Sequence, residues 1–101
     1  MKIAINNFTW NVSFVKSFDK EKFGTTRYLT QEIQVLDSLS KEEKLRTLIH
    51  ELTHAFMSSY GFGQIDEWTT EVVCDFMSTY ADSIVRLADS IIKELGIKEE
   101  K

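Results

Sequence analysis

The chain is poor in the residues that cross-link or break a fold: it has no proline and one cysteine among its 101 residues. Cys74 alone cannot form an internal disulfide, so the sequence predicts a protein of a reducing compartment such as the cytoplasm. Basic residues are also few, because 12 Lys and Arg face 16 Asp and Glu and the net charge is −4. Nucleic-acid binding needs clustered Lys and Arg, and we therefore expect no nucleic-acid partner.

Long hydrophobic runs are missing as well. The first residues, MKIAINN, hold no apolar stretch of signal-peptide length, and no later run reaches the length of a membrane span, so we expect no membrane partner. Hydrophobic residues make up 43% and charged residues 28%, which is typical of a globular protein. A chain of 101 residues has room for one small core, which predicts a single domain over residues 1–101.

The most informative stretch is LIHELTHAFM at residues 48–57, which contains the motif HExxH and the only two histidines of the chain. Apolar residues recur around it at intervals of three and four, which predicts an amphipathic helix. On a helix, His50 and His54 lie one turn apart and can present two imidazoles to one metal ion. Glu51 lies beside them and can act on a water at the metal without being a ligand. The alternative is two polar residues on a solvated helix face.

Two helices are predicted. The first begins after Ser40, which with Glu43 forms a capping box, and it ends near residue 58 or 59 because residues 60–64 contain two glycines. The second should begin after Asp66 and keep its apolar period to Gly96, with a stop near residue 81 or 82 as the alternative.

Strands are predicted before the helices, between Ile3 and Leu36. Aromatic and β-branched residues alternate with polar ones from Trp10 to Phe18, and β character returns after a charged turn at residues 19–24, as one bent strand or two paired strands. The predicted fold class is therefore α+β: a small antiparallel sheet of about three strands, packed on a central HExxH helix and a long C-terminal helix.

A catalytic zinc site usually has three protein ligands, so two histidines need a third partner. The sequence favours Glu71, which lies early in the second helix after a glycine-containing loop. Asp75 follows one turn later, where it could accept a hydrogen bond from a ligand histidine and orient its ring. Glu67, on the same helical face, and Cys74 are the alternatives. The predicted cofactor is Zn²⁺.

This arrangement resembles the thermolysin-like metallopeptidases, the gluzincins, over Ser40 to Tyr80. At this size the chain looks most like the minimal gluzincins of phages and mobile elements, including the ImmA/IrrE group. The resemblance implies zinc-dependent hydrolysis of peptide bonds in a protein or peptide substrate, with a regulatory protein as one target class. It further implies that His50, His54 and Glu71 bind the metal, that Glu51 is catalytic, and that Asp75 supports a histidine.

One departure from the family concerns the oxyanion, because no further histidine is left to stabilise it. Tyr60 and Tyr28 are the candidates, with Tyr80 and Arg27 as other choices. The resemblance also implies that an extended substrate pairs with the outer strand of the sheet, which we expect to be the strand of residues 30–36.

Two other functions compete with proteolysis. The chain could be a zinc-stabilised, non-catalytic binding or regulatory module, in which the metal supports a small fold. It could also be a metal-free interaction domain that forms a homodimer through the apolar stripe of the C-terminal helix.

Overall fold

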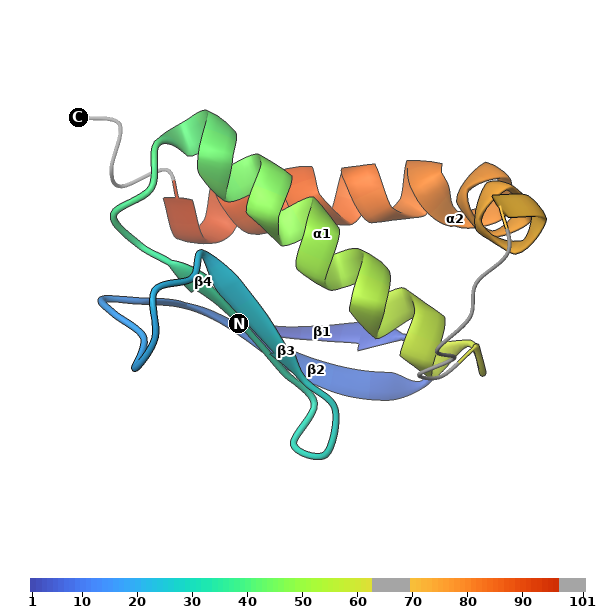
Figure 1. The fold of residues 1–101 in the computed structure, drawn as a ribbon, viewed down its shortest axis with the longest axis horizontal. Coiled ribbons are helices and arrows are strands. Elements are labelled where there is room, and N and C mark those ends of the chain that lie inside the picture. The colour runs from blue at the N-terminus through green and yellow to red at the C-terminus, as the bar shows by residue number, and fades with distance from the viewer. Residues whose placement is uncertain (63–69, 97–101) are drawn as a thin grey trace.

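Four strands precede two helices in the computed structural model, which describes residues 1–62 and 70–96 (Figure 1). The elements in chain order are β1 (Lys2–Ile5), β2 (Phe8–Val15), β3 (Gly24–Arg27), β4 (Glu32–Leu36), α1 (Lys41–Ser59), α2 (Thr70–Ile91) and a short π-helical segment, η1 (Ile92–Gly96). The α+β class is confirmed. β2 ends at Val15, so the strand predicted to extend to Phe18 is shorter than expected.

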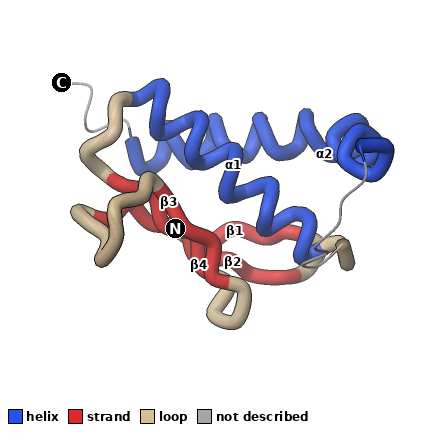
Figure 2. Tube along the Cα trace, in the orientation of Figure 1, coloured by secondary structure: helices blue, strands red, loops and turns tan. Residues whose placement is uncertain are grey.

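The sheet has four strands in the order β1-β2-β4-β3 (Figure 2). β1 pairs antiparallel with β2, β3 pairs antiparallel with β4, and β2 and β4 run parallel. The expectation of about three antiparallel strands is therefore wrong. The reason lies in the connection after β2, because the chain crosses to the outer edge, forms β3 there, and returns as β4 into the middle of the sheet. Residues 24–36 are thus two paired strands, not one bent strand.

Both helices lie on the same side of the sheet, where they enclose the core (Figure 1). The period of two in β2 places Trp10 and Val12 on the buried face, as the sequence predicts, while Asn11 between them is exposed. The core side chains that are at most 1% exposed come from the sheet, from α1 and from α2: Trp10, Val12, Ile33, Val35, Leu48, Leu52, Ala55, Phe76, Ile84, Ala88 and Ile91.

Helix α1 begins where its capping residue predicts. The Ser40 side chain accepts a hydrogen bond from the Glu43 backbone N–H at 3.2 Å, which satisfies one of the free donors of the first turn. The helix ends at Ser59, and Gly61 follows with a φ of 87°, a conformation that suits glycine. The buried stripe of α1 faces the sheet, which leaves His50 and His54 on its exposed side.

Polar contacts fix the C-terminal end of α1 on the sheet. The Trp10 indole N–H donates to Ser59 Oγ at 2.9 Å, and the Asn6 side-chain amide donates to the Ser59 carbonyl at 2.8 Å. These two bonds hold the helix at its far end, and its packing against β3 holds the middle. Together they set the position of the histidine turn relative to the edge of the sheet.

Helix α2 covers the rest of the core. Aromatic side chains of α2 pack against the residues that follow α1: Tyr80 lies 4.5 Å from Tyr60 and Phe76 lies 5.4 Å from Phe62, measured between ring centroids. The helix continues past Ala81 and Asp82 without a stop. The predicted start near Asp66 lies outside the described residues. Among the helices that the structure describes, none has the length and apolar character of a membrane span.

Candidate functional site

The two histidines of the motif lie next to each other on the exposed face of α1. The ring centroids of His50 and His54 are 5.0 Å apart, at an interplanar angle of 72°. This is the spacing expected for side chains one helical turn apart. Because both side chains are exposed and close, one metal ion can contact a ring nitrogen of each.

Glu51 points the other way and is buried, with 8% of its surface exposed. Its carboxylate accepts a hydrogen bond from Thr26 Oγ1, with an oxygen to oxygen distance of 2.6 Å at Oε1. The same hydroxyl lies 3.2 Å from the Glu51 backbone carbonyl. Burying a carboxylate is costly unless it is hydrogen-bonded, and here the bond comes from an edge strand 25 residues earlier in the chain. A carboxylate held in this way beside two exposed imidazoles is a candidate functional group.

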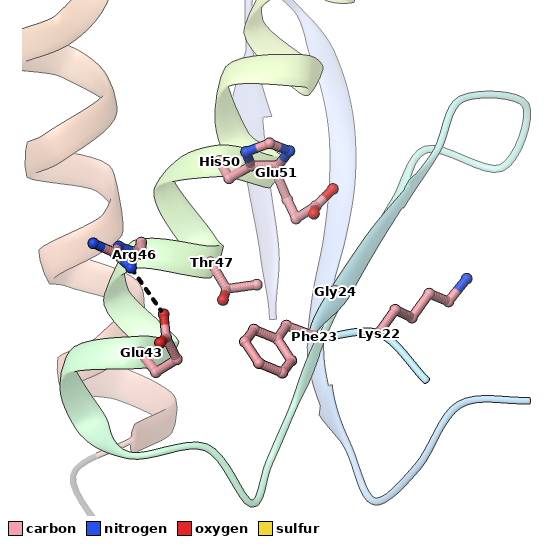
Figure 3. A pocket seen from close by; sticks show the side chains of 8 residues that line it. All are labelled: Lys22, Phe23, Gly24, Glu43, Arg46, Thr47, His50 and Glu51. Carbon is pink, nitrogen blue, oxygen red and sulfur yellow. Dashed lines mark ion pairs between the residues drawn. The ribbon is translucent and has the colours of Figure 1, made fainter. Parts of the chain in front are cut away.

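A cleft of about 460 Å³ lies between α1 and the segment that leads into β3. Figure 3 shows the Glu51 side chain reaching from α1 toward β3. His50 lies above it, and the side chains of Thr47 and Phe23 lie below it. Phe23 is half exposed, at 51%, and forms one apolar wall. The remaining lining residues are Lys22, Gly24, Glu43 and Arg46. Two residues of the motif, His50 and Glu51, therefore line the cleft.

Gly24 allows β3 to approach α1 closely. A Cβ placed on Gly24 would lie 2.8 Å from Thr47 Cγ2, 3.1 Å from the Gln34 carbonyl oxygen and 3.2 Å from Glu51 Cγ. The first distance is too short for a carbon contact, so a side chain at this position would push the strand away from the helix. From the sequence, Gly24 was predicted only as part of a turn, and neither Gly24 nor Thr26 was predicted as a residue of the site.

We predict that Gly24→Ala lowers the free energy of unfolding by about 1–3 kcal/mol, because the added methyl overpacks the contact between strand and helix. Urea unfolding would measure the change. Thr47→Ser removes the methyl that lies nearest, so the double variant should regain part of the loss relative to Gly24→Ala. A Gly24→Ala protein as stable as the wild type would contradict this close approach.

Of the tyrosines considered as oxyanion donors, the structure places Tyr28 on the site's side of the sheet. Burial raises the pKa of the Tyr28 phenol above its usual value of 10.0, and the negative charge of Glu51 raises it further. The phenol therefore stays protonated at neutral pH and can donate a hydrogen bond. Tyr60 caps the C-terminal end of α1 and stacks with Phe56 and Tyr80, two to three turns beyond Glu51.

The outer strand next to α1 is β3, which corrects the expectation for residues 30–36. β4 lies inside the sheet, with β2 on one side and β3 on the other, so its backbone groups are already paired. Leu36 N–H donates to the Phe23 carbonyl at 2.8 Å, and this fixes which residues of β3 bond to β4. By the alternation of an antiparallel ladder, Gly24 and Thr26 direct their N–H and C=O groups to the open edge.

The third ligand cannot be read from the side chains that the structure describes. Among these side chains, no group of three His, Cys, Asp or Glu is placed to hold a metal ion. Glu71, Cys74 and Asp75 lie in the first turns of α2, but their side chains, like all of Glu67, lie outside the described part of the chain. The choice between Glu71 and its alternatives therefore still rests on the sequence.

No protein-family model, curated protein or solved structure matches the chain. The resemblance to gluzincins therefore rests on the residues of the motif and of the helix that follows it. Function has to be argued from the side chains of the site, since a fold class alone does not specify an activity.

These side chains form a chemically coherent group. Two imidazoles face solvent, buried Glu51 lines the cleft, and Gly24 of the edge strand β3 lines the same cleft. The arrangement can bind a transition metal, accept a proton from a water in the cleft, and pair with an extended peptide.

Proposed function

We propose that the chain is a zinc-dependent peptidase that hydrolyses peptide bonds in an extended protein or peptide substrate. One observation carries the proposal: buried Glu51 lines one cleft together with exposed His50, and its carboxylate is hydrogen-bonded to the edge strand β3. If this part of α1 were only a solvated helix face, it would have no need of a buried carboxylate that is hydrogen-bonded to a neighbouring strand.

His50 and His54 would hold the zinc ion, together with Glu71 as the third ligand and Asp75 behind one of the imidazoles. The donor set fits the metal, because neutral imidazole nitrogens and a carboxylate oxygen are common ligands of catalytic zinc. The ring separation of 5.0 Å supports binding of one ion by both histidines. We propose Glu71 as the third ligand from its position in the sequence alone, early in the helix that follows the motif.

A zinc ion in this place would supply Lewis acidity, which would polarise a carbonyl group and make water more acidic. Glu51, a lining residue of the cleft, would be the general base: its carboxylate would take a proton from the attacking water and return it to the departing amine. Tyr28, kept protonated by burial and by the charge of Glu51, is the donor we assign to the developing negative charge on the carbonyl oxygen.

The substrate would add as a further strand to the open edge of β3, where Gly24 and Thr26 offer backbone N–H and C=O groups. Recognition through backbone bonds suits an extended segment of another protein, in keeping with a peptidase encoded by a phage or mobile element that acts on a regulatory protein. The single cysteine fits action in the reducing cytoplasm.

Metal analysis of the purified protein tests the proposal before a substrate is known. The wild type should bind one zinc ion per chain, and His50→Ala and Glu71→Ala should each reduce zinc affinity by at least about tenfold because each removes one of three ligands. Arg46→Ala, on the same exposed face of α1 but without a metal donor, is the matched control and should bind zinc as the wild type does. A wild-type chain that binds no zinc would refute the proposal.

One observation favours a second function, the non-catalytic zinc module. Glu51 is satisfied by Thr26 inside the fold, so its carboxylate could serve packing alone. In that case Glu51→Gln would change stability without any loss of activity, because there would be no activity to lose. A comparison of peptide hydrolysis by zinc-loaded wild type and Glu51→Gln therefore separates the two functions.

A further inference from the structure

The Glu51 side chain is confined by two residues of the edge strand. Thr26 Oγ1 donates to the carboxylate at 2.6 Å, and Gly24 lies so close to the aliphatic stem that a Cβ placed on it would be 3.2 Å from Glu51 Cγ. The Thr26 hydroxyl also lies 3.2 Å from the Glu51 carbonyl oxygen, so a single hydroxyl contacts both the backbone and the side chain of the same residue. This double contact fixes the position of β3 along the axis of α1.

Thr26 also lies on the open edge of the sheet. Its backbone N–H and C=O point away from β4, as the Leu36 to Phe23 hydrogen bond and the strand register require. Its side chain lies on the face of β3 that packs on α1, at right angles to these backbone groups. A peptide that pairs with β3 therefore bonds to the residue whose hydroxyl holds the carboxylate.

We infer that Thr26 is a positioning residue for the proposed peptidase: its hydroxyl fixes the Glu51 carboxylate beside the strand edge where a substrate docks. The inference rests on the proposed function. It adds a residue that the HExxH motif does not contain, and this residue serves both parts of the site: its backbone groups bond to the substrate, and its hydroxyl aligns the base.

Three substitutions separate the hydroxyl from the rest of the side chain. Thr26→Val keeps the β-branched shape and loses the hydroxyl, and Thr26→Ala loses it with a smaller group in place. Thr26→Ser keeps the hydroxyl and should rescue the wild-type behaviour. Thr25→Val is the matched control, because Thr25 is the neighbouring residue on the opposite face of the same strand.

The first measurement needs no activity. Three-bond NMR couplings report the rotamers of the Glu51 side chain in the full chain, both without metal and with zinc. We expect a single rotamer in the wild type, Thr26→Ser and Thr25→Val, and several in Thr26→Val and Thr26→Ala. An equally ordered Glu51 in the variants that lack the hydroxyl would overturn the inference.

The second measurement uses zinc-loaded protein and the fastest-cleaved peptide from a fluorescence-quenched peptide mixture. Thr26→Val should lower kcat by about 10- to 100-fold with little change in KM, because the docking edge is intact and only the base is misaligned. Thr26→Ser should restore kcat. A loss confined to KM, or an equal loss in Thr25→Val, would refute the positioning role while the peptidase itself stands. Zinc-loaded wild type that cleaves no peptide would refute the proposed function and, with it, the role of Thr26 in catalysis.

Discussion

Glu51→Gln is expected to keep zinc bound and to lower the rate of peptide hydrolysis by about 10²- to 10⁴-fold, the contribution of a general base. Glutamine has nearly the same shape, and its carbonyl oxygen can still accept the hydrogen bond that Thr26 donates to the carboxylate. Only the ability to take up a proton is lost. The measurement is kcat/KM on zinc-loaded protein, with zinc content determined on the same sample.

Two readouts show that Glu51→Gln acts through this charge. Glu42→Gln, an exposed change in the first turn of the same helix, should leave hydrolysis unchanged. The pKa of Tyr28 should fall in Glu51→Gln, because one of the two causes that raise it is the carboxylate. Turnover that is undiminished at full zinc occupancy would rule out Glu51 as the base.

Removal of zinc should lower the melting temperature of the wild type by roughly 15–30 °C. Binding to the folded state alone stabilises it by about 4 kcal/mol when free zinc exceeds its Kd a thousandfold. In a domain of this size, each kcal/mol shifts the melting temperature by about 4–8 °C. Thermal scans with and without a chelator measure the shift.

His54→Ala separates the effect of the metal from the effect of the chelator. This variant loses a ligand on an exposed helix face, so its melting temperature should be nearly the same with and without chelator and should match that of the stripped wild type. A wild-type protein that melts at one temperature under both conditions would favour the metal-free interaction domain.

The fold was predictable where one segment specifies its own structure. Ser40 and the two glycines in residues 60–64 predict the first and last residues of α1 to within a residue, and the alternation around Trp10 predicts which face of β2 is buried. The order of the strands was not predictable in this way. The parallel pairing of β2 with β4 depends on where a long connection crosses, and no residue of that connection encodes its path.

The candidate site shows the same division. His50, Glu51 and His54 lie within one helical turn, so their spacing in the sequence is also their spacing in space. Thr26 and Gly24 reach the site only because β3 becomes an edge strand beside α1, and a threonine and a glycine in a polar stretch carry no sign of that outcome. The outer strand was misassigned for the same reason, since residues 30–36 look more strand-like than β3 does.

The path of the chain through the sheet also bears on the order in which the site assembles during folding. β3 and β4 are joined by only residues 28–31, so they can pair as a local hairpin at a small cost in chain entropy. The parallel contact of β4 with β2 closes a longer loop and belongs to the slower, non-local part of folding. The strand that bears Gly24 and Thr26 is therefore paired on its inner side before the sheet it borders is complete, and its outer edge stays open to a partner strand.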